Sequence, residues 1–331
     1  MKIAVIGSGS WGTALAQVLA DNGHEVVLKG RNPAEAMDIT LYHRNSKFFG
    51  NTEISHRLIA STDYEVVKDA EVCVLSVPVA AISATAAEVA ACLEKPAIII
   101  NVAKGFDPAT KDRMSLTIRR QMGDKASQVV SLIGPSHAEE VIIRLLTSVN
   151  AVCEDEEAAR TVQELFANSY FRVYRNTDVV GAEIAAALKN IMAIASGILT
   201  GLNQGDNARA ALMTRGLHEI TRYGLHFGGK QETFLGLNGV GDLIVTCSSV
   251  HSRNYQAGLA IGKADDASEF LKNNTKTTEG IATTKVVYEK AKEEGIDMPI
   301  TEAVYQVLYE LKKPSEVIGG LMSRSLKSEA D

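Results

Sequence analysis

The sequence predicts an α/β protein in which a parallel-sheet domain is followed by an all-helical domain. In the first half of the chain, short apolar and β-branched runs alternate with alanine-rich helical stretches, the βαβ pattern of a parallel sheet. Beyond about residue 180 the strand pattern fades and helical periodicity continues. We therefore expect a first domain over residues 1–180 and a second over residues 181–331 that share a large interface, because no Pro/Ser-rich linker separates them.

The individual elements follow from local composition. Runs rich in valine and isoleucine predict strands at residues 2–6, 25–28, 71–77, 97–102, 128–133, 148–153 and 171–175. Helix-forming stretches predict helices of the first domain from the turn after residue 9 to about 22, at 79–93 and at 155–167. The second domain is expected to contain helices at 182–202, 208–225, 280–294, 301–311 and 315–322.

The first expected strand leads directly into a glycine-rich turn and then into a helix. Gly7 can form the tight turn, Gly9 leaves room for a pyrophosphate, and Gly12 lets the helix lie close to the strand. The positive end of that helix then faces the phosphate charge. A glycine turn without a ligand is the alternative, but the strand before it and the helix after it favour a dinucleotide site.

Composition limits the possible partners. Of 331 residues, 46% are hydrophobic and 22% charged, and the net charge of -6 argues against general attraction to nucleic acid or membranes. The four cysteines have no C-x-x-C spacing, which predicts free thiols in a reducing compartment and no metal site. The N-terminal residues run straight into the glycine turn without a secretory pattern, so we expect a cytoplasmic protein.

The stretch 182–202 is nearly long and apolar enough to span a bilayer. It contains Lys189 and Asn190 near its middle. A lysine at mid-helix costs roughly 2.5 to 3.5 kcal/mol on insertion scales, so a buried helix of a soluble domain is favoured over a membrane span.

Polar residues follow several expected strands, where an open α/β sheet binds its ligands. Arg31 follows the second strand and could contact a 2'-phosphate, which makes NADP as well as NAD plausible; a solvated surface charge is the alternative. Lys104 follows the strand at 97–102 and could direct its charge at a phosphate or at the nicotinamide, or could simply begin a solvent loop. The turn Gly134-Pro135-Ser136 could offer N–H groups and a hydroxyl.

Lys189 is the leading candidate for proton transfer, because lysine is rarely buried without a partner or a task. Its neighbours at helical spacing are mostly small, and a snorkelling lysine is the alternative. Hydride transfer to or from a secondary alcohol also moves a proton, which a desolvated lysine can donate and accept. Asp242, in a glycine-rich turn, could orient that lysine or a substrate hydroxyl, or could belong to a simple turn.

Ser252-Arg253-Asn254 precedes an expected helix and combines a guanidinium, a hydroxyl, an amide and free N–H groups. Arginine can bind phosphate through two hydrogen bonds, and the helix N-terminus adds its own positive end. An N-cap with an unrelated arginine is the alternative interpretation.

Taken together, the chain resembles the NAD(P)-dependent sn-glycerol-3-phosphate dehydrogenase family of the bacterial cytoplasmic type. The resemblance covers nearly the whole chain and rests on motifs in the same order: Gly7-Ser8-Gly9-Ser10-Trp11-Gly12-Thr13-Ala14-Leu15, Lys104-Gly105, Gly134-Pro135-Ser136-His137-Ala138-Glu139-Glu140, Leu188-Lys189-Asn190, Asn207-Ala208-Arg209-Ala210-Ala211-Leu212, Gly241-Asp242-Leu243, Ser252-Arg253-Asn254 and Glu279-Gly280.

The resemblance implies a Rossmann domain followed by a helical domain of the 6-phosphogluconate-dehydrogenase-like kind, in a homodimer. It implies reversible reduction of dihydroxyacetone phosphate to sn-glycerol 3-phosphate for phospholipid synthesis. Cofactor contacts are implied for Gly7, Gly9, Ser10, Trp11, Gly12, Arg31, Lys104, Ala138, Arg253 and Glu279. Substrate contacts are implied for Lys104, Gly134, Ser136, Lys189, Asp242, Ser252, Arg253 and Asn254, with Lys189 and Asp242 as the catalytic candidates.

The chain departs from the family pattern at three places. Residues 141–147 are bulkier than the small residues usual there and lack the glycine-proline-like turn. Lys29 stands where tryptophan is common, and Asn32 follows Arg31 where histidine or another polar residue is frequent. These departures concern the path of one loop and the choice between NAD and NADP.

Two other functions are also considered. A related β-hydroxyacid or 6-phosphogluconate-type dehydrogenase would share the two-domain plan but need other residues in place of Ser252-Arg253-Asn254. A non-catalytic NAD(P) sensor would keep the glycine turn without the chemistry, and the presence of Lys189 argues against it.

Overall fold

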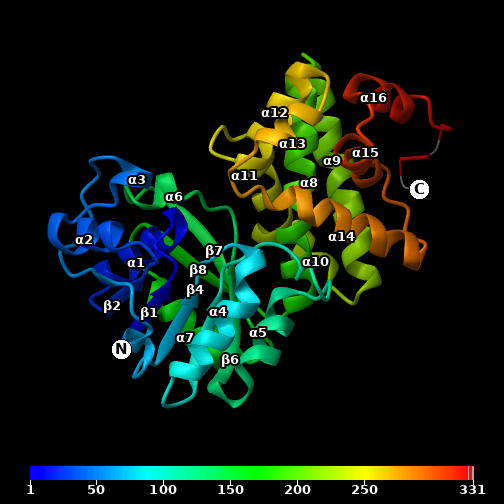
Figure 1. The fold of residues 1–331 in the computed structure, drawn as a ribbon. Coiled ribbons are helices and arrows are strands. Elements are labelled where there is room, and N and C mark those ends of the chain that lie inside the picture. Colours follow the sequence, from blue (N-terminus) through cyan, green and yellow to red (C-terminus); the bar gives the residue numbers. More distant parts are fainter. Residues whose placement is uncertain (327, 330–331) are drawn as a thin grey trace. The chain divides into compact units, whose positions relative to one another are not determined.

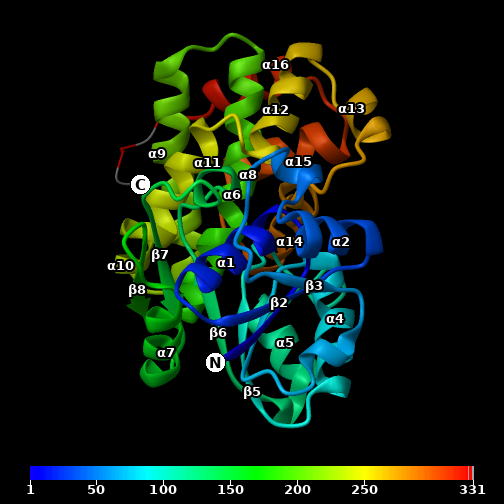
Figure 2. The same ribbon diagram turned by 90° about the vertical axis from the view of Figure 1, so that its left-hand side faces the viewer.

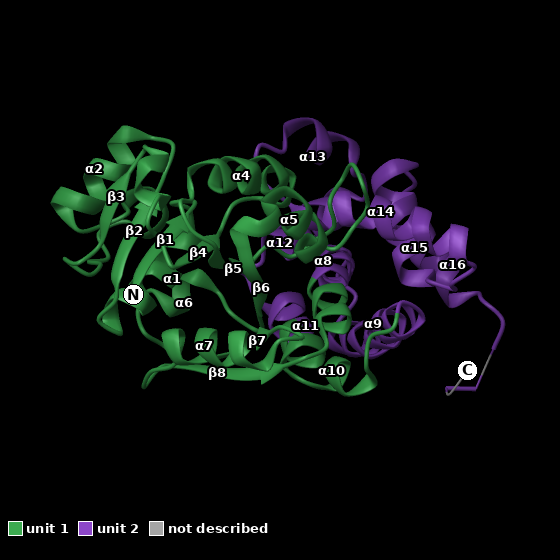
Figure 3. Cartoon of the chain, turned by 90° about the horizontal axis from the view of Figure 1, so that it is seen from below, with its two compact units in different colours: residues 1–186, 228–242 green, residues 187–227, 243–331 purple. Residues whose placement is uncertain are grey.

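The computed structural model describes residues 1–326, 328 and 329. By internal packing the chain divides into two compact units, coloured separately in Figure 3. Unit 1 comprises Met1–Ala186 and Gly228–Asp242, and unit 2 comprises Ala187–Phe227 and Leu243–Asp331. Residues 327, 330 and 331 at the end of the second expected domain lie outside the described residues.

Unit 1 is built on one eight-stranded sheet with the order β3-β2-β1-β4-β5-β6-β7-β8. Figure 1 shows strands of this sheet together with helices α1, α4, α5 and α7 of the same unit. The strands are β1 Lys2–Ile6, β2 Glu25–Lys29, β3 Ile59–Ser61, β4 Val72–Leu75, β5 Ala97–Asn101, β6 Ala126–Ile133, β7 Thr147–Val152 and β8 Phe171–Asn176. The first six are parallel, and the strand order reverses direction between β1 and β4. The predicted Rossmann-type sheet is therefore confirmed.

Helices cover both faces of this sheet (Figure 3). The helical segments of unit 1 before residue 179 are α1 Ser10–Asp21, α2 Pro33–Tyr42, α3 Ser46–Phe49, η1 Tyr64–Val67, α4 Val79–Cys92, α5 Met114–Met122, η2 Gly123–Lys125, α6 Ala138–Val141 and α7 Glu156–Phe166. One core packs α1, α6 and α7 against side chains such as Val5 and Val74, and the other packs α4 and α5 against Ile6 and Leu75. Successive strand residues thus enter opposite cores, as the alternation along a buried strand requires.

One pairing differs from an all-parallel sheet, because β6 and β7 run antiparallel. The chain between them contains only the four-residue helix α6. Such a helix spans about 6 Å, whereas a parallel connection must return along a strand of eight residues, about 26 Å long. The connection therefore contains no helix long enough to return along the strand, as the crossover helix of a parallel pair does.

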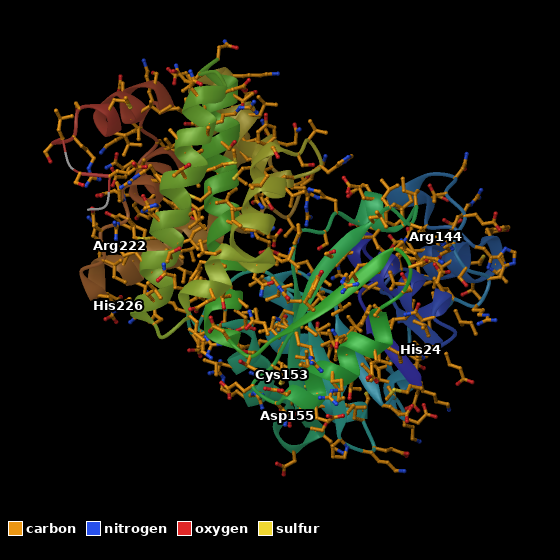
Figure 4. The ribbon with its side chains drawn as sticks, turned by 180° about the vertical axis from the view of Figure 1, so that it is seen from behind. His24, Arg144, Cys153, Asp155, Arg222 and His226 are labelled. Atoms are coloured by element: carbon orange, nitrogen blue, oxygen red, sulfur yellow. The ribbon has the colours of Figure 1, made fainter. Side chains whose placement is uncertain are left out.

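The unusual segment 141–147 forms an ordered turn. Val141 and Ile142 are buried in the core beside α1. Arg144, labelled in Figure 4, has a φ of 63° and donates from Nε and Nη2 to the two carboxylate oxygens of Asp21, at 2.8 and 3.1 Å. The Tyr170 hydroxyl donates to the same carboxylate at 2.7 Å. Bulky apolar anchors and this charged network hold the turn in place of small residues.

The described residues of unit 2 form helices and loops without strands, as predicted. The helices are α8 Val179–Gly201, which begins in unit 1, α9 Asp206–His226, α11 Asp242–Ser248, α12 Arg253–Ala264, α13 Ser268–Asn273, α14 Glu279–Glu294, α15 Pro299–Tyr309 and α16 Pro314–Met322 (Figure 2). Two short segments, α10 Gln231–Leu235 and the π-helical turn η3 Leu237–Gly241, belong to unit 1.

Helices α8 and α12 approach each other backbone to backbone. A Cβ on Gly258 of α12 would overlap the Ile194 carbonyl of α8, and one on Gly262 would overlap the Ile198 carbonyl. On the α8 side, a Cβ on Gly197 would overlap the Tyr255 carbonyl. Only glycine permits this distance between the two helices, so their register within unit 2 is fixed.

Among the described residues, α8 is the one helix long and apolar enough to cross a membrane. Of the 18 residues in its most apolar stretch, 83% are buried inside the protein. A core helix of a soluble protein passes the same test of length and composition. The four cysteines are free, as predicted, and burial raises the pKa of the Cys73 thiol to about 12.

A buried carboxylate, Glu219 of α9, caps the start of α15. It accepts hydrogen bonds from the Ile300 N–H at 2.5 Å, the Thr301 N–H at 3.2 Å and the Thr301 hydroxyl at 3.1 Å. Burial raises the pKa of Glu219 to about 7, and the hydrogen bonds from Ile300 and Thr301 oppose that rise. The folded protein therefore holds this proton more tightly than the unfolded chain.

This shift predicts a pH dependence of stability. Because the folded pKa lies above the unfolded value near 4.5, the stability that Glu219 contributes is fully present below pH 4.5 and is lost as the pH rises through about 7. The loss is at most about 3 kcal/mol. Glu219→Gln removes this titration, so the difference in thermal midpoint between pH 5 and pH 8 should shrink. Glu94→Gln, an exposed control, should leave it unchanged; an equal effect of both variants would contradict the assignment.

Candidate active site

The glycine turn lies at the carboxyl end of β1. Gly7 has a φ of 112°, and a Cβ there would overlap the Ser76 carbonyl. A Cβ on Gly12 would overlap the Gly7 carbonyl, whereas a Cβ on Gly9 would meet no atom within 4 Å outside Gly9 and its two neighbours in the chain. Gly7 and Gly12 are thus required by the fold itself, and Gly9 leaves space for a ligand. Ser10 and Trp11 form the first turn of α1, whose first N–H groups are not satisfied by an N-cap side chain.

The segment after β2 lies at the same edge of the parallel sheet. Lys29, the last residue of β2, is buried with its ammonium 3.7 Å from the Tyr64 ring centroid. Arg31 is exposed beyond it, and Asn32 caps α2 by accepting from the Ala34 N–H at 2.9 Å. The lysine found in place of a tryptophan therefore lies against an aromatic ring, and the Arg31 side chain is exposed to solvent.

A second group of side chains in unit 1 converges on Lys104. This residue follows β5, and its Nζ donates to the Gly134 carbonyl at 3.0 Å and to Asp242 Oδ2 at 2.9 Å. The Ser136 hydroxyl donates to the same carbonyl at 3.0 Å. Asp242 is 1% exposed and Lys104 18%, so the pair is largely shielded from water. The fold thus joins four predicted site residues, Lys104, Gly134, Ser136 and Asp242, that are up to 138 positions apart.

The start of α8 is fastened to the sheet by Glu183, which is 4% exposed. Its carboxylate accepts from the Ser131 hydroxyl at 2.7 Å, the Ser115 hydroxyl at 2.8 Å and Arg113 Nη1 at 3.0 Å. Asn101, at the end of β5, donates to the same group at 3.3 Å. This charge is paired and hydrogen-bonded, as a buried carboxylate requires.

In unit 2, Lys189 lies on α8 with 5% exposure. Its Nζ donates to the Thr246 hydroxyl on α11 at 2.6 Å. Thr246 was absent from the predicted site. One sequence feature could have identified Thr246: it follows Asp242 by four residues, which places both side chains on one face of a helix.

The residues predicted to bind phosphate lie at the N-terminus of α12. Ser252 caps this helix and accepts from the Tyr255 N–H at 3.2 Å, and Arg253 is exposed in its first turn. Asn254 donates to Asn190 Oδ1 at 3.0 Å and accepts from the Gly280 N–H at 2.9 Å. These bonds join α12, the residue after Lys189 on α8, and the start of α14, where Glu279 lies half-buried.

Ala138, the remaining predicted residue, begins α6 and is buried. In the described part of the chain, none of the predicted site residues borders the apolar hollow of about 660 Å³ between α8, α9, α15 and α16 of unit 2. That hollow is therefore separate from the predicted site residues. No cluster of three His, Cys, Asp or Glu that could hold a metal ion occurs among the described residues.

The fold and these groups place the chain in the class of two-domain dinucleotide-binding α/β proteins. Two family models match it, described as the N-terminus and the C-terminus of NAD-dependent glycerol-3-phosphate dehydrogenase, over residues 2–159 and 178–319. The chain belongs to this family.

Individual relatives agree with the family match. The chain is 49% identical to a glycerol-3-phosphate dehydrogenase (NAD(P)+) of Geobacillus kaustophilus, over 100% of this chain and 96% of the relative. It is 47% identical to the protein of that name from Streptococcus uberis, over 99% and 98%. Among solved structures, the glycerol-3-phosphate dehydrogenase of Coxiella burnetii superposes with a TM-score of 0.91 at 33% identity, over 97% of this chain and 98% of that one.

Proposed function

We propose that this protein is an NAD(P)-dependent sn-glycerol-3-phosphate dehydrogenase that reversibly reduces dihydroxyacetone phosphate for glycerophospholipid synthesis. The observation that carries the proposal is Lys189, a buried lysine bonded to Thr246, in a chain that matches both halves of that family. In this proposal the functional division follows the domain boundary predicted from the sequence. Residues 1–180 bind the cofactor, and residues 181–331 supply Lys189 and the phosphate-binding groups.

The glycine turn suits a dinucleotide, because the open space beside Gly9 and the uncapped start of α1 can accept a pyrophosphate. When bound, the nicotinamide donates or accepts the hydride. The proposed cofactor contacts are the three glycines together with seven further residues: Ser10, Trp11, Arg31, Lys104, Ala138, Arg253 and Glu279.

Lys189 Nζ supplies the proton. In reduction its ammonium donates a proton to the carbonyl oxygen of dihydroxyacetone phosphate, and in oxidation the neutral amine takes a proton from the hydroxyl. The Thr246 hydroxyl accepts a hydrogen bond from Nζ and so fixes where the proton is delivered. Burial makes the charge on Nζ effective at the developing alkoxide, because little water screens it.

Two groups of side chains are proposed to bind the substrate. Lys104, oriented by Asp242 and the Gly134 carbonyl, presents a cation at the sheet edge. Ser252, Arg253 and Asn254 offer the N-terminus of α12 and a guanidinium to the substrate phosphate. In this proposal the enzyme is a cytoplasmic homodimer, and the resemblance to bacterial enzymes supports that state.

A substrate panel tests the reaction. Purified protein is mixed with reduced cofactor and dihydroxyacetone phosphate, and absorbance of the reduced nicotinamide is followed; the reverse direction uses sn-glycerol 3-phosphate, a β-hydroxyacid and 6-phosphogluconate. We expect turnover with dihydroxyacetone phosphate in reduction and with sn-glycerol 3-phosphate in oxidation, and with neither of the other two compounds. Turnover only with a β-hydroxyacid or 6-phosphogluconate would replace the proposal, and cofactor binding without any turnover would indicate a sensor.

Arg31 makes a prediction about cofactor choice. Its exposed guanidinium follows β2, where it can pair with a 2'-phosphate, so NADPH should be used at least as efficiently as NADH. The ratio of kcat/KM values for the two cofactors measures this. A strong preference for NADH would contradict the role of Arg31.

A further inference from the structure

Glu35, which the proposed contacts do not include, lies in the first turn of α2. Its carboxylate accepts from Lys47 Nζ at 2.6 Å and, more weakly, from the Ser8 hydroxyl and Asn32 Nδ2, each at 3.4 Å. Ser8 belongs to the glycine turn. A single carboxylate therefore links the turn after β1 with the segment after β2.

The backbone brings these two segments together. A Cβ on Gly30 would lie 2.7 Å from the Ser8 hydroxyl oxygen and 3.2 Å from the Ser8 Cβ, so the end of β2 and the glycine turn approach each other closely. In a sheet of this order, the ribose of a bound adenosine lies where the first turn meets the end of the second strand. Asn32, Glu35 and Lys47 also line a hollow of about 540 Å³. The carboxylate thus lies beside open space.

The two members of the ion pair differ in exposure. The Glu35 side chain is 15% exposed and the Lys47 side chain 61%. An ion pair that is exposed on one side costs little to open, because water solvates the released lysine. Lys47 can therefore leave Glu35 when another anion is present, while Glu35 stays near Ser8.

We propose that Glu35 and Lys47 form a cofactor-selecting pair. With NAD(H), the Glu35 carboxylate accepts a hydrogen bond from the ribose 2'-hydroxyl. With NADP(H), Lys47 turns from Glu35 to the 2'-phosphate and joins Arg31 there, which offsets repulsion between that phosphate and the carboxylate. This inference rests on the proposed function and specifies how one site accepts both cofactors.

Opposite effects of the two members distinguish this pair from a structural ion pair. Glu35→Gln removes the repelling charge and weakens the acceptor, so the ratio of affinities should shift toward the 2'-phosphorylated ligand by about tenfold. Lys47→Met removes the compensating cation, so the ratio should shift about tenfold the other way. A structural role would change both affinities in parallel.

Calorimetric titration with two ligands that lack nicotinamide measures this ratio without turnover. The probes are adenosine 5'-diphosphate and its 2'-phosphorylated form, with the full-length wild type and both variants. Lys68→Met and Glu94→Gln serve as matched controls, because that exposed pair, joined at 3.3 Å, precedes β4 and β5 at the amino ends of the strands. The controls should leave the ratio unchanged.

Opposite shifts in the two variants support the proposal. Parallel changes, or unchanged ratios in variants that still bind both probes, overturn the selecting pair while the proposed dehydrogenase function stands. A wild-type protein that binds neither probe overturns the selecting pair and the proposed function together. Lys47→Gln, which keeps a polar side chain at an exposed position, should repeat the effect of Lys47→Met.

Discussion

Replacing Lys189 by alanine is expected to lower kcat for reduction of dihydroxyacetone phosphate by about a thousandfold, the middle of the range for loss of a general acid. The reason is that Lys189 Nζ is the proposed proton donor, and a water in its place carries no charge and is a much weaker acid than an ammonium. Affinity for NADPH should stay within about twofold, because the proposed pyrophosphate contacts lie in the glycine turn. Steady-state kinetics and calorimetric titration measure the two quantities.

Two further variants sharpen this result. Thr246→Val keeps the lysine but removes its acceptor, so kcat should fall by an intermediate amount of about tenfold. Lys290→Ala, which removes a half-buried lysine paired with Glu294 on α14, should leave kcat unchanged. Turnover in Lys189→Ala above about a tenth of the wild-type value would show that another group supplies the proton.

Gly258→Ala is expected to destabilise unit 2 by about 3 kcal/mol or more, the upper range for overpacking. The new Cβ would overlap the Ile194 carbonyl, so α12 has to move away from α8. That movement also separates Asn254 from Asn190, and activity should fall with stability. Thermal unfolding measures the change, since each kcal/mol lowers the midpoint by roughly 2–4 °C in a domain of this size.

Gly319→Ala is the matched control, because this glycine also lies within a helix but has no atom within 4 Å of its Cβ position. Alanine there gains up to about 1 kcal/mol of helix propensity, so the midpoint should stay the same or rise slightly. Equal effects of the two substitutions would mean that the close approach of α8 and α12 does not limit stability.

The elements predicted best from the sequence are those whose signals are local. The run of apolar residues at 2–6, followed by three spaced glycines, leads to β1, its turn and α1 within a few residues of the expected ends. The long apolar stretch around Lys189 likewise becomes α8. Periodicity and glycine spacing are properties of one segment, and they do not depend on which segment packs against it.

Features that depend on distant segments were missed. β3 is only three residues long and exists because it pairs with β2. The antiparallel β7 follows from the shortness of α6, and no pattern within β7 itself indicates its direction. A pairing of this kind is decided by the fold as a whole.

The site shows the same division. Lys104, Lys189 and Asp242 were singled out from their own surroundings, but the bond of Lys104 to Asp242 joins positions 138 residues apart and could not be predicted from spacing. Thr246 and Glu35 look like ordinary helix residues in the sequence. Their interest comes from the contacts with Lys189 Nζ and the Ser8 hydroxyl, which only the folded chain brings together.

Product analysis tests the central claim most directly. The purified protein is incubated with dihydroxyacetone phosphate and NADPH, and loss of NADPH is compared with formation of sn-glycerol 3-phosphate. The account predicts equal amounts of the two in the wild type and, over the same time, about a thousandfold less of each in Lys189→Ala. No sn-glycerol 3-phosphate from wild-type protein that binds NADPH would contradict it.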